Sequence, residues 1–174
     1  VYIAFRFKKI GGLSAGVFAL VALIHDIVIV FSSFIFFRLP LDANFMAVVL
    51  TILGYSINNT IVTYDRIREN RTLYGKKMGL VELMNTSVSQ TMTRSINTTV
   101  TTAFAALAIC VVALVCGVES IISFAFPLLI GLVAGFYSSV FMSGSMWVSW
   151  QLHKERKRLR KRNKFFSEPD LVGL

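Results

Sequence analysis

The chain has 174 residues, of which 55% are hydrophobic and 16% charged, and its formal net charge is +9. A soluble domain averages about 45–50% apolar and about 25% charged residues. Here no charge lies between Phe45 and Tyr64 or between Ile121 and Gln151, and such runs are typical of membrane spans, so we predict an all-α, polytopic membrane helix bundle.

The first part of the chain is predicted to hold the end of one helix and one complete span. Residues 1–9 resemble the end of a truncated transmembrane helix, because the basic Lys8 and Lys9 precede a glycine pair that is typical of a turn. A bundle of four spans is expected over 10–151. Its first span is predicted at about 13–37, and Asp26 is the only charge in its apolar part.

The second span is predicted at about 45–64, after a short link in which Asp42 is placed to cap the helix. An amphipathic segment on the cytoplasmic side is expected at 66–90. Its apolar residues recur at helical spacing, which favours a helix lying at the membrane interface. The third and fourth spans are predicted at about 91–117 and 121–150.

Small residues recur every fourth position along the fourth span, and this pattern indicates close helix packing in lipid. They are Ser123, Pro127, Gly131, Gly135, Ser139 and Ser143.

Basic residues gather on one side of these spans. All except Arg38 fall on or near one face if Arg94 is counted with it, and the positive-inside rule makes that face cytoplasmic. The basic tail at 152–174 has eight Lys or Arg among residues 154–164. We interpret it as a topology signal that meets the lipid bilayer surface, and we expect no nucleic acid partner.

Asp26 is the first candidate functional residue. A carboxylate at bilayer depth costs about 2.5–3.5 kcal/mol, so its side chain should face the bundle interior. Two interpretations stay open, namely a role in an ion or proton pathway and a neutral group that is hydrogen-bonded to a neighbouring helix.

A second candidate group lies on the second span and consists of Ser56, Asn58, Asn59 and Thr60. These side chains could line a hydrated path, coordinate a cation or join helices. Arg94 of the third span should lie at a similar depth to Asn59, because the two helices are antiparallel. Either Arg94 extends to the cytoplasmic interface or it has a role inside the bundle.

Other chemistry is not indicated by the sequence. It contains no glycine-rich phosphate loop, no Cys/His metal spacing and no nucleophile–base pair. We therefore expect no enzyme activity, no cofactor and no metal centre.

Several motifs resemble the membrane part of the SecF family. They are residues 22–26 (Ala-Leu-Ile-His-Asp), residues 54–60 (Gly-Tyr-Ser-Ile-Asn-Asn-Thr), the following cytoplasmic signature with Asp65, Arg66, Arg68 and Glu69, and residues 89–98 around Arg94.

The resemblance implies a half of the resistance-nodulation-division architecture in the bacterial plasma membrane. It further implies partnership with SecD and the SecYEG translocon, and use of the transmembrane ion gradient to draw out an unfolded exported polypeptide through an outer domain that is missing here. The family's coupling residues would be an Asp at position 59 and an Arg at position 94. This sequence has Asn59, which cannot exchange a proton. The proton would then be carried by Asp26 or by SecD, the coupling ion would be Na⁺, or this copy would not couple.

Two alternatives remain. One is a related exporter of small molecules or lipids, and the other is a non-coupling scaffold for SecD.

Overall fold

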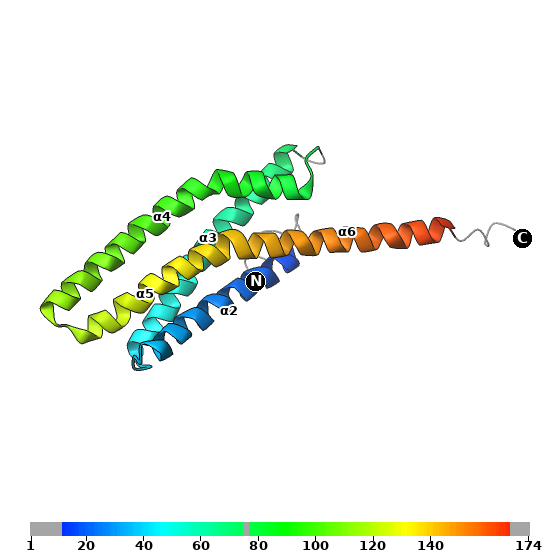
Figure 1. Cartoon of the computed structure of the whole chain (residues 1–174). Helices are drawn as coiled ribbons and strands as arrows, with labels where there is room; N and C mark the ends of the chain where they lie inside the picture. Colours follow the sequence, from blue (N-terminus) through cyan, green and yellow to red (C-terminus); the bar gives the residue numbers. More distant parts are fainter. Residues whose placement is uncertain (1–11, 75–76, 168–174) are drawn as a thin grey trace, which may run out of the picture.

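The structure, a computed structural model, describes residues 12–74 and 77–167, which form a bundle of long helices (Figure 1). The predicted helix end at 1–9 lies outside the described residues. The helices are α2 (Gly12–Phe36), α3 (Ala43–Tyr74), α4 (Leu80–Cys116), α5 (Glu119–Tyr137), the π-helix η2 (Ser138–Met142) and α6 (Ser143–Ser167).

Among the described residues, four helices are long and apolar enough to cross a membrane: Leu13–Phe36, Ala43–Tyr74, Leu80–Cys116 and the continuous Glu119–Arg160. Their outer surfaces carry large apolar side chains, including Leu13, which is 79% exposed, and Val115, which is 83% exposed. Such extensive apolar surface is unusual on a soluble monomer. The prediction of an all-α bundle with four spans is confirmed.

Tight turns join the helices at the end where α2 stops and α3 starts. Arg38 has a φ of 53°, and the Leu39 N–H bonds to the Phe34 carbonyl at 2.9 Å, which together form a Schellman motif. Asp42 Oδ1 then accepts the N–H of Asn44 at 2.9 Å, so Asp42 caps α3 as predicted.

The predicted stripe of small residues faces the interior of the bundle. Gly131, Gly135 and Ser139 are all buried, and α5 contacts α2, α3 and α4. On an ideal α-helix, side chains four residues apart differ by about 40° in direction, so a stripe with this spacing gradually turns around the helix. The π-helix η2 inserts one extra residue and turns the stripe back by about 100°. Ser143 is therefore still fully buried after η2.

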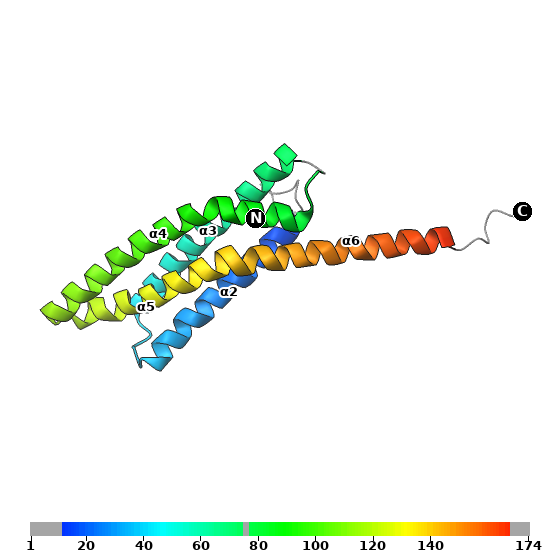
Figure 2. The ribbon, with the colours of Figure 1, turned by 45° about the horizontal axis from the view of Figure 1, so that its top comes forward.

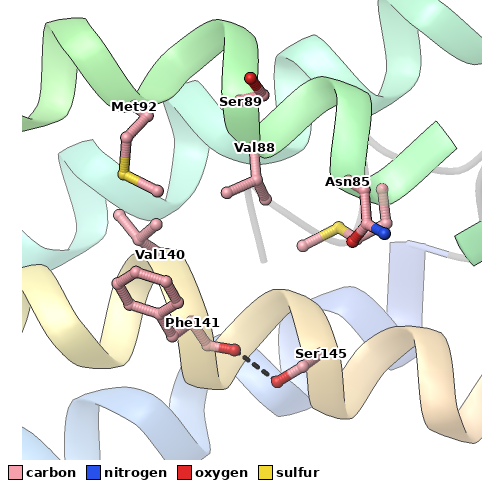
Figure 3. A pocket seen from close by; sticks show the side chains of 8 residues that line it. Asn85, Val88, Ser89, Met92, Val140, Phe141 and Ser145 are labelled. Atoms are coloured by element: carbon pink, nitrogen blue, oxygen red, sulfur yellow. Dashed lines mark hydrogen bonds between the residues drawn. The ribbon is translucent and has the colours of Figure 1, made fainter. Parts of the chain in front are cut away.

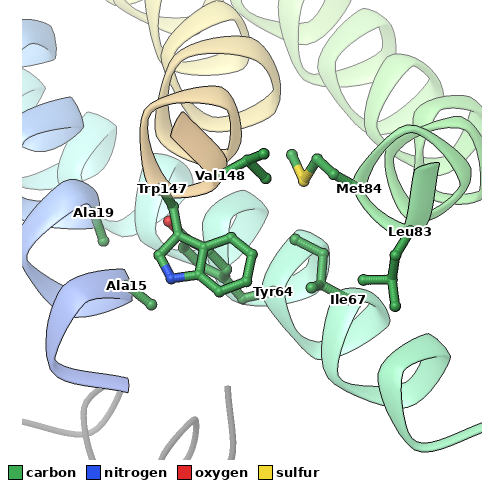
Figure 4. Close-up of a cluster of buried hydrophobic side chains, with 8 residues drawn as sticks. All are labelled: Ala15, Ala19, Tyr64, Ile67, Leu83, Met84, Trp147 and Val148. Carbon is green, nitrogen blue, oxygen red and sulfur yellow. The ribbon is translucent and has the colours of Figure 1, made fainter. Parts of the chain in front are cut away.

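The segment between the second and third spans differs from the expectation. α3 continues to Tyr74, and α4 starts at Leu80 and runs without a break into the third span. Leu83 and Met84 are buried with Trp147 in an apolar cluster (Figure 4). The apolar side of 79–89 therefore packs on other helices rather than forming a separate interfacial helix, because α3 and α6 extend far enough to cover it.

Two apolar clusters flank a polar layer in the middle of the bundle. One cluster, around Tyr64 and Trp147, lies at the end where α3 joins α4, which we call the basic end. The other, around Phe34 and Ile52, lies toward the opposite end. Between them the buried positions are mostly polar: Asp26, Ser56, Asn59, Thr60, Thr63, Ser138, Ser139 and Ser143.

The helix formed by α5, η2 and α6 projects beyond the bundle at the basic end (Figures 1 and 2). All side chains from His153 to Arg160 are exposed. The basic tail therefore starts as a helical extension of the last span.

Candidate functional site

The centre of the polar layer is formed by Asp26 of α2, Ser56 of α3, and Ser138 and Ser139 of η2, which we call the Asp26 cage. Asp26 Oδ2 accepts hydroxyl hydrogen bonds from Ser56 at 2.6 Å and from Ser138 at 2.8 Å. Asp26, Ser56 and Ser138 are fully buried, and Ser139 is 1% exposed. The expectation that Asp26 faces the interior is thus met, and three helical elements converge on its carboxyl group.

His25 lies on the other side of this carboxyl group. Its Nδ1 is 3.2 Å from Asp26 Oδ1, and its side chain is 31% exposed. Within the described part of the chain, no Lys or Arg forms an ion pair with Asp26. The buried carboxyl group therefore depends on hydroxyl donors and on one imidazole.

The π-helix η2 is the reason that Ser138 and Ser139 both reach the cage. Ser138 Oγ contacts Asp26, and Ser139 Oγ donates to the Ser56 carbonyl at 3.0 Å. Adjacent residues of an α-helix are about 100° apart, whereas a π-turn brings consecutive side chains closer to one direction, and such turns are frequent at functional sites. Ser139 was predicted only as a packing residue, and Ser138 was not predicted as a site residue. The consecutive serines in an apolar run were the available signal.

Asn59 and Thr60 lie one turn along α3 from the cage, toward the basic end. Asn59 is 4% and Thr60 is 2% exposed. Within the described residues, Asn59 Nδ2 has no hydrogen-bond partner. Burying an amide group without a hydrogen-bond partner costs free energy.

Asn58 and Arg94 lie elsewhere. Both are exposed on the outer surface of the helix pair α3 and α4. No hydrogen bond or ion pair of the described residues joins Arg94 to Asp26 or Asn59. Asn97 and Thr101 continue this exposed polar face along α4. The predicted site residues therefore separate into an internal group and an outward-facing group.

Asp65, Arg66, Arg68 and Glu69, which were predicted as a cytoplasmic signature, lie on α3 at the basic end. Arg66 Nη1 pairs with Glu69 Oε2 at 2.7 Å, and Arg68 Nη2 pairs with Asp65 Oδ1 at 3.0 Å. Arg66 Nε also donates to Gln90 Oε1 of α4 at 2.7 Å. The two ion pairs lie within α3 and contribute little energy individually, whereas the hydrogen bond from Arg66 to Gln90 links α3 to α4.

A hollow of about 380 Å³ lies between α4 and the helices η2 and α6 (Figure 3). Its walls are mainly apolar, with Val88 and Met92 on one side and Val140 and Phe141 on the other. Such walls suit hydrocarbon rather than an ion. The candidate site is therefore the Asp26 cage and not this hollow.

The donor set of the cage also limits its chemistry. In the described ranges, no group of three or more His, Cys, Asp or Glu could hold a metal ion. The cage offers one carboxylate and several neutral oxygens, which suit proton exchange or a hard cation rather than a transition metal.

Comparisons with known proteins give the family. Residues 1–153 match the family model "Protein export membrane protein SecD/SecF, C-terminal". The chain is 42% identical over 139 residues to the protein translocase subunit SecF of Acidaminococcus fermentans, covering 80% of this chain and 44% of that protein. It is 36% identical over 159 residues to the SecDF of Bacillus subtilis, covering 90% of this chain and 20% of that protein.

A solved structure gives the same result. The crystal structure of SecDF in its super-membrane-facing form matches with a TM-score of 0.83 and 34% identity, over 92% of this chain and 21% of that one. The chain spans about half the length, or less, of each of these SecF proteins. Sequence motifs, helix arrangement and family model agree over most of the chain, which therefore belongs to the SecD/SecF family of protein-export membrane proteins.

Proposed function

We propose that the chain is part of an accessory subunit of the bacterial Sec protein-export machinery, which works with SecD and uses the transmembrane ion gradient. Membership of the family supports this proposal, and so do relatives named as translocase subunits. The relative named SecDF supports a SecD partner in particular. The working complex would also include SecYEG and an unfolded exported polypeptide.

The observation that carries this proposal is the outward polar face of α3 and α4. Asn58, Arg94, Asn97 and Thr101 are exposed on helices long enough to span the membrane. Intramembrane charged and amide groups are costly against lipid and normally face protein or water. A second helical half, supplied by SecD, would cover this face and pair with Arg94.

The threonines of this face do not need such a partner. The hydroxyls of Thr98 and Thr101 donate to carbonyls of their own helix at 2.9 and 2.8 Å, a bond that satisfies them in lipid. The side chains of Arg94 and Asn97 have several N–H donors, and one hydrogen bond to a carbonyl of the same helix cannot satisfy them all. They are therefore the residues that call for the partner.

In this proposal, ion coupling takes place at the interface between SecD and the outward polar face of α3 and α4. Asn59 cannot exchange a proton, so the exchangeable carboxylate beside Arg94 would come from the partner half. Asp26, Ser56 and Thr60 form the internal part of the pathway in this proposal. The basic end, with the α3–α4 connection and the tail, is placed in the cytoplasm.

A scaffold for SecD that does not couple to the ion gradient is the second candidate. It is favoured by the buried Asn59, which occupies the position where the family resemblance implies an aspartate. In this case the chain would stabilise SecD, and protein export would not depend on Arg94.

Cysteine crosslinking in native membranes tests the proposed interface with SecD. Asn97→Cys should form an adduct with SecD, whereas Val17→Cys, on the exposed apolar side of α2, should not. An Asn97→Cys variant that forms no adduct with SecD would contradict the proposed interface.

Secretion assays separate coupling from scaffolding. Arg94→Met should slow export at normal SecD levels, and Arg71→Met, an exposed arginine at the end of α3, should not. Unchanged export in Arg94→Met and in Asp26→Asn, together with loss of SecD when the chain is deleted, would instead establish the scaffold.

A further inference from the structure

A groove of about 400 Å³ runs between α2 and α6 near the basic end of the bundle. It is lined by Phe18 of α2 and by five residues of α6, namely Ser145, Met146, Ser149, Trp150 and His153. The rings of Phe18 and Trp150 meet edge to face, with their centroids 6.2 Å apart. Trp150 is still 53% exposed, so the groove has an apolar wall that is open to its surroundings. Such a wall on a membrane-spanning helix suits a hydrocarbon chain.

The face of α6 that lines the groove becomes basic where the groove ends. α6 continues without a break to Ser167, and residues three or four apart lie on the same face of a helix. Arg156 and Lys157 follow His153 at these spacings, so they continue the face on which Trp150 lies. Both are exposed, and among the described residues neither forms an ion pair. One face of α6 therefore changes from apolar to positively charged within about three helical turns.

The position of Trp150 places this change at the border between hydrocarbon and lipid headgroups, where tryptophan is enriched. Lys157 lies one turn beyond His153, at about 10 Å along the helix from Trp150. The long side chains of lysine and arginine can bend back toward this border. The basic residues are therefore placed where the phosphate of a lipid lies when its acyl chain is beside Trp150.

We propose that this groove binds one phospholipid with an anionic headgroup, taken from the cytoplasmic leaflet. One acyl chain lies against Phe18 and Trp150, and the phosphate accepts charge-assisted hydrogen bonds from Arg156 and Lys157. An apolar groove followed by positive charges complements this ligand, because a phospholipid joins hydrocarbon to a phosphate. A soluble polyanion would leave the groove unused. The choice of leaflet depends on the proposed orientation, but binding depends neither on that orientation nor on a role in export.

Quenching of the Trp150 fluorescence tests the site, and the difference between the protein and its Trp150→Phe variant isolates the Trp150 signal. The purified protein is placed in phosphatidylcholine bilayers with a small fraction of lipid that carries brominated acyl chains, which quench nearby tryptophans. At equal mole fraction, brominated phosphatidylglycerol should quench Trp150 more than brominated phosphatidylcholine, with an apparent preference of about tenfold. Ser149→Phe, which fills the groove without changing its charge, should remove this preference.

Two charge-matched double variants separate this site from a general attraction to anionic lipid. Arg156→Gln combined with Lys157→Gln should remove most of the preference. Lys154→Gln combined with Arg158→Gln removes the same charge from another face of α6, and it should change the preference less than about twofold. Equal losses in the two double variants, or equal quenching by the two lipids in the unaltered protein, would overturn the proposal. Competition by soluble glycerol phosphate would also overturn it, because the site would then bind phosphate rather than lipid.

Discussion

At the scale of single residues, two kinds of hydrogen bond recur among the buried polar side chains of this bundle, one to a carbonyl of the same helix and one to a side chain of another helix. Ser33 and Thr91 belong to the first kind, because their hydroxyls donate to carbonyls three or four residues earlier. Asn70 belongs to the second kind. It is 1% exposed, and its Nδ2 donates to Ser87 Oγ and to Gln90 Oε1 of α4, both at 2.8 Å. Only the second kind fixes one helix against another.

Replacing Asn70 with Ala should lower the free energy of unfolding by about 1–2 kcal/mol, because two hydrogen bonds between α3 and α4 are lost. Denaturant titration of the purified protein measures this change. Thr72→Ala is the control, since its exposed hydroxyl donates to the Arg68 carbonyl of the same helix, and its effect should stay within about 0.5 kcal/mol. Equal losses in the two variants would show that Asn70 does not join the helices.

At the scale of helices, the approach of α5 to α3 depends on glycine. A Cβ atom built on Gly131 would lie 2.6 Å from Ile52 Cγ1 and 3.0 Å from Val30 Cγ2. Both neighbours are buried side chains of other helices. The small residue therefore sets how closely the helices can pack, as expected where packing rather than the hydrophobic effect holds helices together in lipid.

Gly131→Ala should therefore lower the free energy of unfolding by about 1–3 kcal/mol through overpacking. Gly54→Ala should be neutral or stabilising by up to about 1 kcal/mol, because its Cβ would meet no heavy atom within 4 Å. A double-mutant cycle with Ile52→Ala locates the cause. The two changes should partly compensate each other, and simple additivity would exclude Ile52 as the clashing side chain.

At the scale of the whole molecule, the two ends of the bundle differ in charge. The helical extension from His153 to Arg160 is exposed and carries five of the basic residues of the tail. At the opposite end, the link between α4 and α5 begins with Gly117 in the left-handed region, at a φ of 69°, and is followed by Glu119. This asymmetry sets the proposed orientation, in which the basic end is cytoplasmic.

Labelling of intact cells with a membrane-impermeant maleimide measures this orientation. In a Cys116→Ser background, which removes the exposed native cysteine, Glu119→Cys should be labelled in intact cells. Lys157→Cys should be labelled only after the cells are permeabilised. The reverse pattern would place the basic tail outside and would contradict the proposed orientation.

The sequence by itself determined the class, the four spans and the inward position of Asp26. These features follow from local properties, namely uncharged apolar runs of sufficient length and the cost of a charge in lipid. The small residues along α5 were also predictable, because their spacing places them on one helix face. Asp42 was identified as a cap from its position alone.

Only the tertiary structure decided which polar residues meet. Asn58 and Asn59 are neighbours in the sequence, yet one is exposed and the other is buried. Ser138 reaches Asp26 across 112 positions of the chain because a π-turn redirects it. Arg94 points outward rather than toward Asp26. Helical periodicity defines a face of a helix, but which face turns inward depends on the packing of all the helices together, and that is a non-local property.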